Sequence, residues 1–305
     1  MEPPLILLIG KNGQVGWELR RALAPMARLA SVDYPEIDLG SSDSIHRCVK
    51  EVNPRVIINA AAYTAVDKAE SEPGAAMRVN GLGPGILAEA AAKKRALLVH
   101  YSTDYIFDGN LQRPYLETDS PNPISAYGRS KLAGDEAVRA VGGAHLIFRL
   151  CWVYGLRGSN FLLTLQRLAR ERDRLRVVND QFGCPTWSRL IAQATALALQ
   201  QTLAAQDPLP LLGTYHLAAA GVATWHDFAS AIVRLMPAAE RKCTEVEPIP
   251  TSEYPLPARR PARSVLDCSK LERVFGLRLP PWNESLQQAL EPDSNPQSPA
   301  PAPNL

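Results

Sequence analysis

Tyr127 and Lys131 are the residues whose types and spacing point most directly to acid–base chemistry. The stretch around them predicts a helix, where residues four apart lie on one face, a turn from each other. An ammonium group beside a phenol favours the phenolate and should lower the tyrosine pKa from about 10 toward neutrality, which gives a usable proton donor. Of the nine tyrosines, only Tyr127 has a lysine four residues later. The alternative is an exposed surface pair, so the rest of the chain has to decide.

A glycine-rich turn follows the first apolar run, residues 5–9, which is typical of a strand buried on both faces of a parallel sheet. The turn reads G-x-x-G-x-x-G and predicts a dinucleotide-binding loop formed by Gly10, Gly13, Gln14, Val15 and Gly16. Glycines allow the backbone to approach a pyrophosphate, and the N-terminus of the next helix offers it free N–H groups.

Asp33 ends the second apolar stretch, where a carboxylate commonly binds the ribose hydroxyls of NAD. No arginine follows immediately to pair with a 2′-phosphate, which favours NADH over NADPH without enforcing it. A plain turn residue is the alternative.

A hydroxyl group should lie beside Tyr127, because ligands of open α/β sheets bind beyond the carboxyl ends of the strands. The apolar run 96–101 predicts a strand that ends in Ser102 and Thr103. We expect Thr103 to hold a substrate carbonyl oxygen, with Ser102 as the rival. An ordinary turn is the alternative interpretation.

Strands and helices alternate from residue 5 to 150, which predicts an α/β fold with a doubly wound, parallel, Rossmann-type sheet. We expect residues 1–150 to form the NAD(P)-binding domain, with 187–219 returning to it. A smaller α/β substrate domain should comprise 151–186 and 220–290, and 291–305 should be a disordered tail. Three local expectations are a short strand at 37–39, a polar connection at 66–73 and a kinked helix from 73 to about 94.

Composition excludes several classes of protein. A net charge of +2 without a basic cluster leaves no footprint for nucleic acid, and the apolar run near the N-terminus is too short for a signal or a membrane span. Five scattered cysteines suggest reduced thiols and no zinc site. We therefore expect a cytoplasmic enzyme.

Seven motifs occur together between residues 4 and 290, and their combination is specific. Through them the chain resembles the extended short-chain dehydrogenase/reductase superfamily and, within it, the dTDP-4-dehydrorhamnose reductases. The motifs are Gly10-x-x-Gly13-Gln-x-Gly16, Asn59-Ala-Ala-Ala-Tyr-Thr-Ala-Val-Asp-Lys-Ala-Glu, Ser102-Thr-Asp-Tyr-Ile-Phe-Asp-Gly, Tyr127-Gly-x-Ser-Lys131-Leu-x-Gly, Arg149-x-x-Trp152-Val-Tyr-Gly, Asn179-Asp-Gln-x-Gly-x-Pro-Thr and Pro257-Ala-Arg-Arg-Pro.

The resemblance implies that the chain catalyses the last reaction of dTDP-L-rhamnose synthesis, and it implies a mechanism for that reaction. NADH or NADPH gives hydride to C4 of a 4-keto sugar nucleotide, and Tyr127 protonates the oxygen. Lys131 lowers the tyrosine pKa and binds the nicotinamide ribose, while Thr103 holds the keto oxygen. The substrate would contact Asp104, Trp152 and, as a weaker candidate, Arg260. The cofactor would contact, besides the glycine loop, Asp33, Asp38, Leu39, Ala62, Tyr63, Thr64 and Tyr101.

Two positions refine this expectation. Related dehydratases carry a glutamate where this chain has Tyr105, so dehydration is not expected. Some family members hold magnesium in a dimer with two acids, and here these positions are Glu18 and Arg189. An arginine repels a divalent cation, so we doubt a magnesium site and leave a homodimer open.

Two alternatives remain from the sequence alone. One is another NAD(P)-dependent sugar-nucleotide reductase or epimerase. The other is a non-catalytic subunit that resembles the regulatory subunit of methionine adenosyltransferase, which has the same fold.

Overall fold

A computed structural model describes residues 2–291 of the chain. The predicted disordered tail therefore lies, from residue 292 on, outside the described residues. Within residues 2–291, no helix combines the length and apolar character needed to cross a membrane.

The centre of the molecule is a sheet of six strands in the order β10-β5-β4-β3-β1-β2. Every neighbouring pair is parallel, which confirms the predicted doubly wound fold. The late strand β10 pairs with β5 at the sheet edge, as expected for a segment that returns to the sheet. The strands are β1 Leu5–Ile9, β2 Arg28–Val32, β3 Val56–Asn59, β4 Leu97–Thr103, β5 His145–Leu150 and β10 Gly213–His216.

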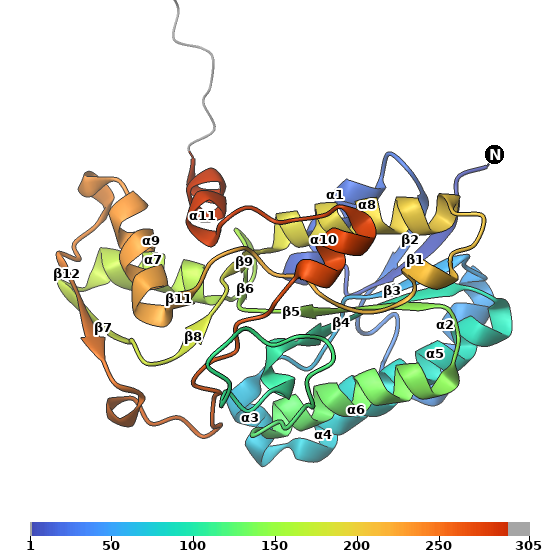
Figure 1. The fold of residues 1–305 in the computed structure, drawn as a ribbon, viewed down its shortest axis with the longest axis horizontal. Coiled ribbons are helices and arrows are strands. Elements are labelled where there is room, and N and C mark those ends of the chain that lie inside the picture. Colours follow the sequence, from blue (N-terminus) through green and yellow to red (C-terminus); the bar gives the residue numbers. More distant parts are fainter. Residues whose placement is uncertain (1, 292–305) are drawn as a thin grey trace, which may run out of the picture.

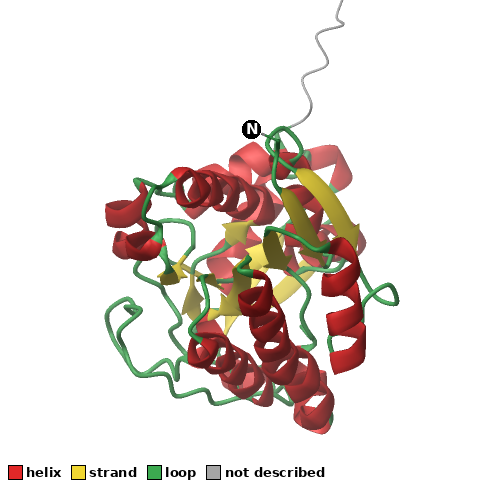
Figure 2. Cartoon of the chain, turned by 90° about the vertical axis from the view of Figure 1, so that its right-hand side faces the viewer, coloured by secondary structure: helices red, strands yellow, loops and turns green. Residues whose placement is uncertain are grey.

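Helices cover both faces of this sheet, which explains why its strands are apolar throughout (Figures 1 and 2). One apolar core lies against α1 Gln14–Leu23, α8 Ser188–Ala204 and α10 Ser269–Phe275. The other lies against α2 Ser42–Val52, α5 Gly83–Lys94 and α6 Ala126–Val141.

A second group of elements forms a smaller lobe with its own core, on the left in Figure 1. It holds three two-stranded sheets, β6–β9, β7–β12 and β8–β11. Its strands are β6 Val153–Tyr154, β7 Arg174–Val178, β8 Phe182–Gly183, β9 Thr186–Trp187, β11 Ala223–Thr224 and β12 Glu245–Ile249, and its helices are α7 Phe161–Glu171, α9 Trp225–Leu235 and α11 Trp282–Leu290. The assignment of domain boundaries stays a prediction.

Three local expectations had different outcomes. Residues 37–39 form turns instead of a strand, and the supposed polar connection contains helix α3, Val66–Ser71. The kinked helix is present as α4, Pro73–Met77, a π-helical turn, Arg78–Leu82, and α5.

Asn80 in the π-helical turn binds two neighbouring elements. Its side-chain amide donates to Tyr63 O at 2.9 Å and to Ser130 Oγ at 3.0 Å, and its Oδ1 accepts from Tyr63 N at 2.8 Å. The turn therefore fixes the loop after β3 against α6.

Candidate active site

The glycine-rich loop has the geometry of an anion-binding helix start. Gly10 has φ +89°, and a Cβ there would lie 2.6 Å from Ala61 N, so only glycine fits. A Cβ on Gly16 would lie 1.9 Å from Gly10 O, because α1 packs directly under the loop. No side chain caps the N-terminus of α1 and its first turn carries no acid, which leaves N–H groups available to an anion.

Asp33 lies at the carboxyl end of β2, beside this loop. Its carboxylate accepts hydrogen bonds from Asn12 N at 3.0 Å and Tyr34 N at 2.9 Å. Glu36 accepts a hydrogen bond from Asp33 N at 3.0 Å and forms an ion pair with Lys11. The end of β2 therefore carries two acids, Asp33 and Glu36, and the one lysine beside them is paired with Glu36.

Tyr127 and Lys131 lie on the first two turns of α6, as predicted. The helix begins after Ser125, whose Oγ accepts from Gly128 N at 3.1 Å. Burial raises the pKa of Tyr127 to about 12, although a hydrogen bond with Thr103 lowers it in part. The expected fall of this pKa was therefore wrong, because burial disfavours the phenolate and the carboxylates of Asp104 and Asp135 disfavour it further.

Lys131 is fully buried, and its ammonium donates to Tyr101 O at 2.6 Å. Burial lowers the pKa of Lys131 to about 8. Its charge is therefore retained at neutral pH and lost in mildly alkaline solution.

Thr103 and Asp104 form a hydrogen-bonded pair at the end of β4. Thr103 Oγ1 donates to Asp104 Oδ1 at 3.1 Å, and Cys151 Sγ donates to Asp104 Oδ2 at 3.2 Å. Burial raises the pKa of Asp104 to about 6 in spite of these donors. Ser102, the rival of Thr103, also faces the cavity, and its buried Oγ has no hydrogen-bond partner among the described residues.

Trp152 is held by its neighbours in a conformation that is rare for a side chain of its size. Its φ is +44°, and its ring stacks on Trp225 with centroids 3.6 Å apart. A Cβ on Gly183 would come within 2.4 Å of the Trp152 ring, so the glycine makes room for it. Trp225 in turn donates from Nε1 to Gln181 Oε1 at 3.1 Å.

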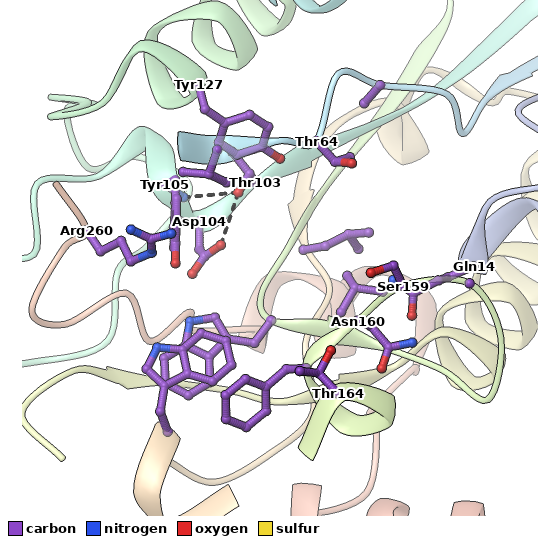
Figure 3. A pocket seen from close by; sticks show the side chains of 18 of the residues that line it. Gln14, Thr64, Thr103, Asp104, Tyr105, Tyr127, Ser159, Asn160, Thr164 and Arg260 are labelled. Carbon is purple, nitrogen blue, oxygen red and sulfur yellow. Dashed lines mark hydrogen bonds between the residues drawn. The ribbon is translucent and has the colours of Figure 1, made fainter. Parts of the chain in front are cut away.

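One cavity of about 1030 Å³ joins these features between the sheet and the smaller lobe. Figure 3 shows Tyr127, Thr103, Asp104 and Arg260 on one wall, with Ser159, Asn160 and Thr164 across the space. A pocket for one small ligand usually has ~300–1,000 Å³, so this cavity can hold a large ligand or two ligands. The predicted residues that line it are Gly10, Gly13, Gln14, Val15, Asp33, Ala62, Thr64, Tyr101, Thr103, Asp104, Tyr127, Lys131, Trp152 and Arg260.

Four predicted cofactor residues do not line the cavity. Gly16 lies under the loop, and Leu39 is buried in the core of the α2–α5 face. Asp38 accepts from Gly40 N at 2.8 Å, and Tyr63 OH donates to Glu72 at 2.9 Å.

The smaller lobe supplies lining residues that the sequence prediction missed. They include Phe161, Thr164, Arg172, Gln181 and Trp225. Gln181 belongs to the motif that begins at Asn179, so the sequence contains a signal for this residue. The other four lie on or beside ordinary amphipathic helices, and nothing in their local pattern singles them out.

Glu18 and Arg189, the two positions at which the sequence made a magnesium site doubtful, form an ion pair. Arg189 Nε lies 3.3 Å from Glu18 Oε2, so the arginine neutralises the acid that magnesium would need. Within residues 2–291, no three His, Cys, Asp or Glu side chains come together as a metal site.

Comparison with known proteins supports these observations. The sequence model of the RmlD substrate binding domain matches residues 4–294, nearly the whole chain. The chain belongs to this family. A dTDP-4-dehydrorhamnose reductase of Burkholderia thailandensis is 50% identical to this member of the RmlD family over 282 residues, which cover 91% of this chain and 95% of that protein.

Solved structures of RmlD relatives have the same fold. The crystal structure of a dTDP-4-dehydrorhamnose reductase from Clostridium acetobutylicum superposes with a TM-score of 0.87 at 36% identity, covering 94% of this chain and 98% of that one. The enzyme from Bacillus anthracis, solved in complex with NADP, superposes with a TM-score of 0.85 at 33% identity and the same coverage.

Proposed function

We propose that this protein is a dTDP-4-dehydrorhamnose reductase, which reduces the C4 keto group of dTDP-4-dehydro-L-rhamnose with NADH or NADPH to give dTDP-L-rhamnose. One observation carries the proposal: Tyr127, Lys131 and Thr103 line the same cavity as the glycine-rich loop. A proton donor and a dinucleotide site in one space are what a keto reduction needs. The names of the close relatives support the choice of substrate.

The residues of the loop fit a nicotinamide dinucleotide. Gly10 and the uncapped start of α1 would hold its diphosphate, and Asp33 would face the adenosine ribose. Gln14 Oε1 is buried without a hydrogen-bond partner among the described residues, which leaves an acceptor for the bound dinucleotide. The chemistry that NAD(P)H supplies when bound is hydride donation to the keto carbon.

Tyr127 is the proton donor in this proposal. Its pKa of about 12 keeps the phenol protonated at neutral pH, and an alkoxide on the sugar is more basic than a phenolate, so the proton moves to the sugar. Lys131, charged below about pH 8, stabilises the phenolate that remains. The hydroxyl of Thr103 orients the keto oxygen beside Tyr127.

Asp104 and Arg260, on the same wall of the cavity as Tyr127, and Trp152 would bind the sugar nucleotide. Trp152, stacked on Trp225, offers a flat apolar surface, and Arg260 offers a cation. Tyr105 is a buried phenol whose pKa burial raises, so it stays uncharged and supplies no carboxylate. The site therefore lacks the extra carboxylate expected of a dehydratase at that position.

The test is oxidation of NADH, and separately of NADPH, with dTDP-4-dehydro-L-rhamnose generated in situ. Formation of dTDP-L-rhamnose is the expected result, and the ratio of the two rates reports the role of Asp33. Binding of dinucleotide without turnover would favour a regulatory subunit, and turnover of a different keto sugar would favour another reductase.

A further inference from the structure

Helix α3 has no role in the reaction as derived so far, yet it contacts both sides of the active site. It belongs to the motif that follows β3 and carries Asp67 and Glu70 on its short length. In Figure 1 it lies between the start of α6 and the segment that returns from the smaller lobe. The two acids bind one of these partners each.

Asp67 binds the segment from the smaller lobe. Its carboxylate makes a bidentate ion pair with Arg260, with Nη2–Oδ2 at 2.7 Å and Nη1–Oδ1 at 3.1 Å, and it accepts from Ala258 N at 3.1 Å. Arg260 is only 16% exposed, and the pair lowers the pKa of Asp67, so both groups are charged at neutral pH. The acid fixes the plane of the guanidinium at the edge of the cavity.

The same segment is seated against the sheet lobe by its backbone. A Cβ on Gly109 would lie 2.7 Å from Ala262 N and 2.8 Å from Pro261 Cβ, so the two chains are in close contact there. Arg260 Nη1 also donates to Ala258 O at 3.0 Å, but the ion pair that holds the whole guanidinium is with Asp67. Its removal should therefore release the guanidinium without unfolding the segment.

Glu70 binds the start of the catalytic helix. Its Oε1 accepts from Ala126 N at 2.7 Å, and Ala126 is the first residue of α6, next to Tyr127. The carboxylate also lies 4.0 Å from Arg129, one turn along the helix. An acid at this place satisfies an N–H group that no backbone carbonyl of the helix can reach and complements the helix dipole.

We propose that α3 is a positioning element: Asp67 sets Arg260 for binding the diphosphate of the sugar nucleotide, and Glu70 sets the start of α6 so that Tyr127 meets the keto oxygen. This rests on the proposed function. The two residues act through different partners, so their loss should affect different kinetic constants. Loss of Asp67 should raise KM, and loss of Glu70 should lower kcat.

The experiment compares four variants with the wild type. Steady-state kinetics gives kcat and KM for the sugar nucleotide, and calorimetry gives the affinities for NADH and dTDP. Asp67→Asn should raise KM and the Kd of dTDP on the order of tenfold with little change in kcat. Glu70→Ala should lower kcat on the order of tenfold with KM nearly unchanged, and Glu70→Gln, which keeps an oxygen acceptor, should recover most of that loss. Lys68→Gln, on the exposed side of the same helix, is the control and should change neither constant.

A double variant tests whether Asp67 acts through Arg260. If it does, Asp67→Asn adds little to the KM of Arg260→Gln. Three results would overturn the assignment of Asp67. They are an additive effect of the two substitutions on KM, an unchanged Kd for dTDP in Asp67→Asn, and a wild-type protein that does not bind dTDP. Equal falls in kcat for Glu70→Ala and Glu70→Gln would overturn that of Glu70. Calorimetry requires no turnover, so an inactive wild type that binds dTDP refutes the proposed reaction alone.

Discussion

Replacement of Asp104 by asparagine should stabilise the protein at neutral pH. Asp104 is 2% exposed, and burial raises its pKa from 3.8 to about 6. A shift of this size corresponds to ~3 kcal/mol of unfavourable free energy for keeping the carboxylate ionised in the folded protein. Asparagine keeps an acceptor for Thr103 or Cys151 without the charge. For a chain of this length, ~3 kcal/mol corresponds to a rise in Tm of at most about 5 °C.

The pH dependence of this effect has a definite sign. Between about pH 4 and 6 the folded protein binds more protons at Asp104 than the unfolded chain does, so wild-type stability falls as pH rises through that window. The Tm advantage of Asp104→Asn should be full above pH 7 and should shrink as pH is lowered from 6 toward 4. Thermal unfolding followed by circular dichroism at half-unit intervals measures it.

Asp119 provides a matched control of opposite sign. Its ion pair with Arg113 lowers its pKa to about 2, so the carboxylate stabilises the fold above pH 4. Asp119→Asn should lower the free energy of unfolding by up to roughly 2 kcal/mol. The loss should be smaller than this limit because solvent screens the exposed Arg113, and it should be constant from pH 5 to 8. A pH-independent Tm difference for Asp104→Asn, or a lower Tm than wild type at pH 8, would refute the reasoning.

Three further outcomes follow from single contacts. Tyr127→Phe should keep NADH affinity and lose roughly 10²–10⁴-fold in kcat; near wild-type turnover would remove Tyr127 from the mechanism. Asp135→Asn should lose about 3–5 kcal/mol in a denaturant titration, because it leaves the fully buried Arg149 without its carboxylate partner at 3.2 Å; an unchanged midpoint would contradict this. EDTA or added magnesium should not change the mass in sedimentation, because Arg189 neutralises Glu18; a magnesium-dependent change in mass would count against that.

The sequence was sufficient to predict the sheet because its strands are buried on both faces and therefore appear as short apolar runs. Residues 37–39 share this apolar character, but Ile37 and Leu39 are buried by turns packed against α2 and α5. Apolar content alone cannot distinguish these arrangements. Helix α3 was missed for the opposite reason. It has six residues and only one fully buried side chain, Ala69, so its pattern has no apolar face to detect.

Predicted site residues lie together in the structure where one short motif defines both their position and their chemistry. Thr103 and Tyr127 each follow a recognisable strand end or helix start, and the structure brings them to one cavity. Trp225 and Gln181 were not recognised, because they reach the cavity through contacts between distant segments. The register of those segments depends on the packing of the smaller lobe, which no local pattern specifies.

The pKa of Tyr127 shows why spacing predicts the partners in a site better than their protonation. The prediction from spacing treated Lys131 as a charge near an otherwise solvated phenol. In the structure Lys131 is buried with its ammonium directed to Tyr101 O, and Tyr127 is partly buried against a small apolar cluster that includes Ala126. Desolvation then raises the pKa of the phenol and lowers that of the lysine, to about 12 and about 8. A donor must carry its proton before the reaction starts, and a phenol with a pKa near 7 would already be half ionised. The pair with these pKa values therefore suits proton donation better than the lowered tyrosine pKa that the spacing predicted.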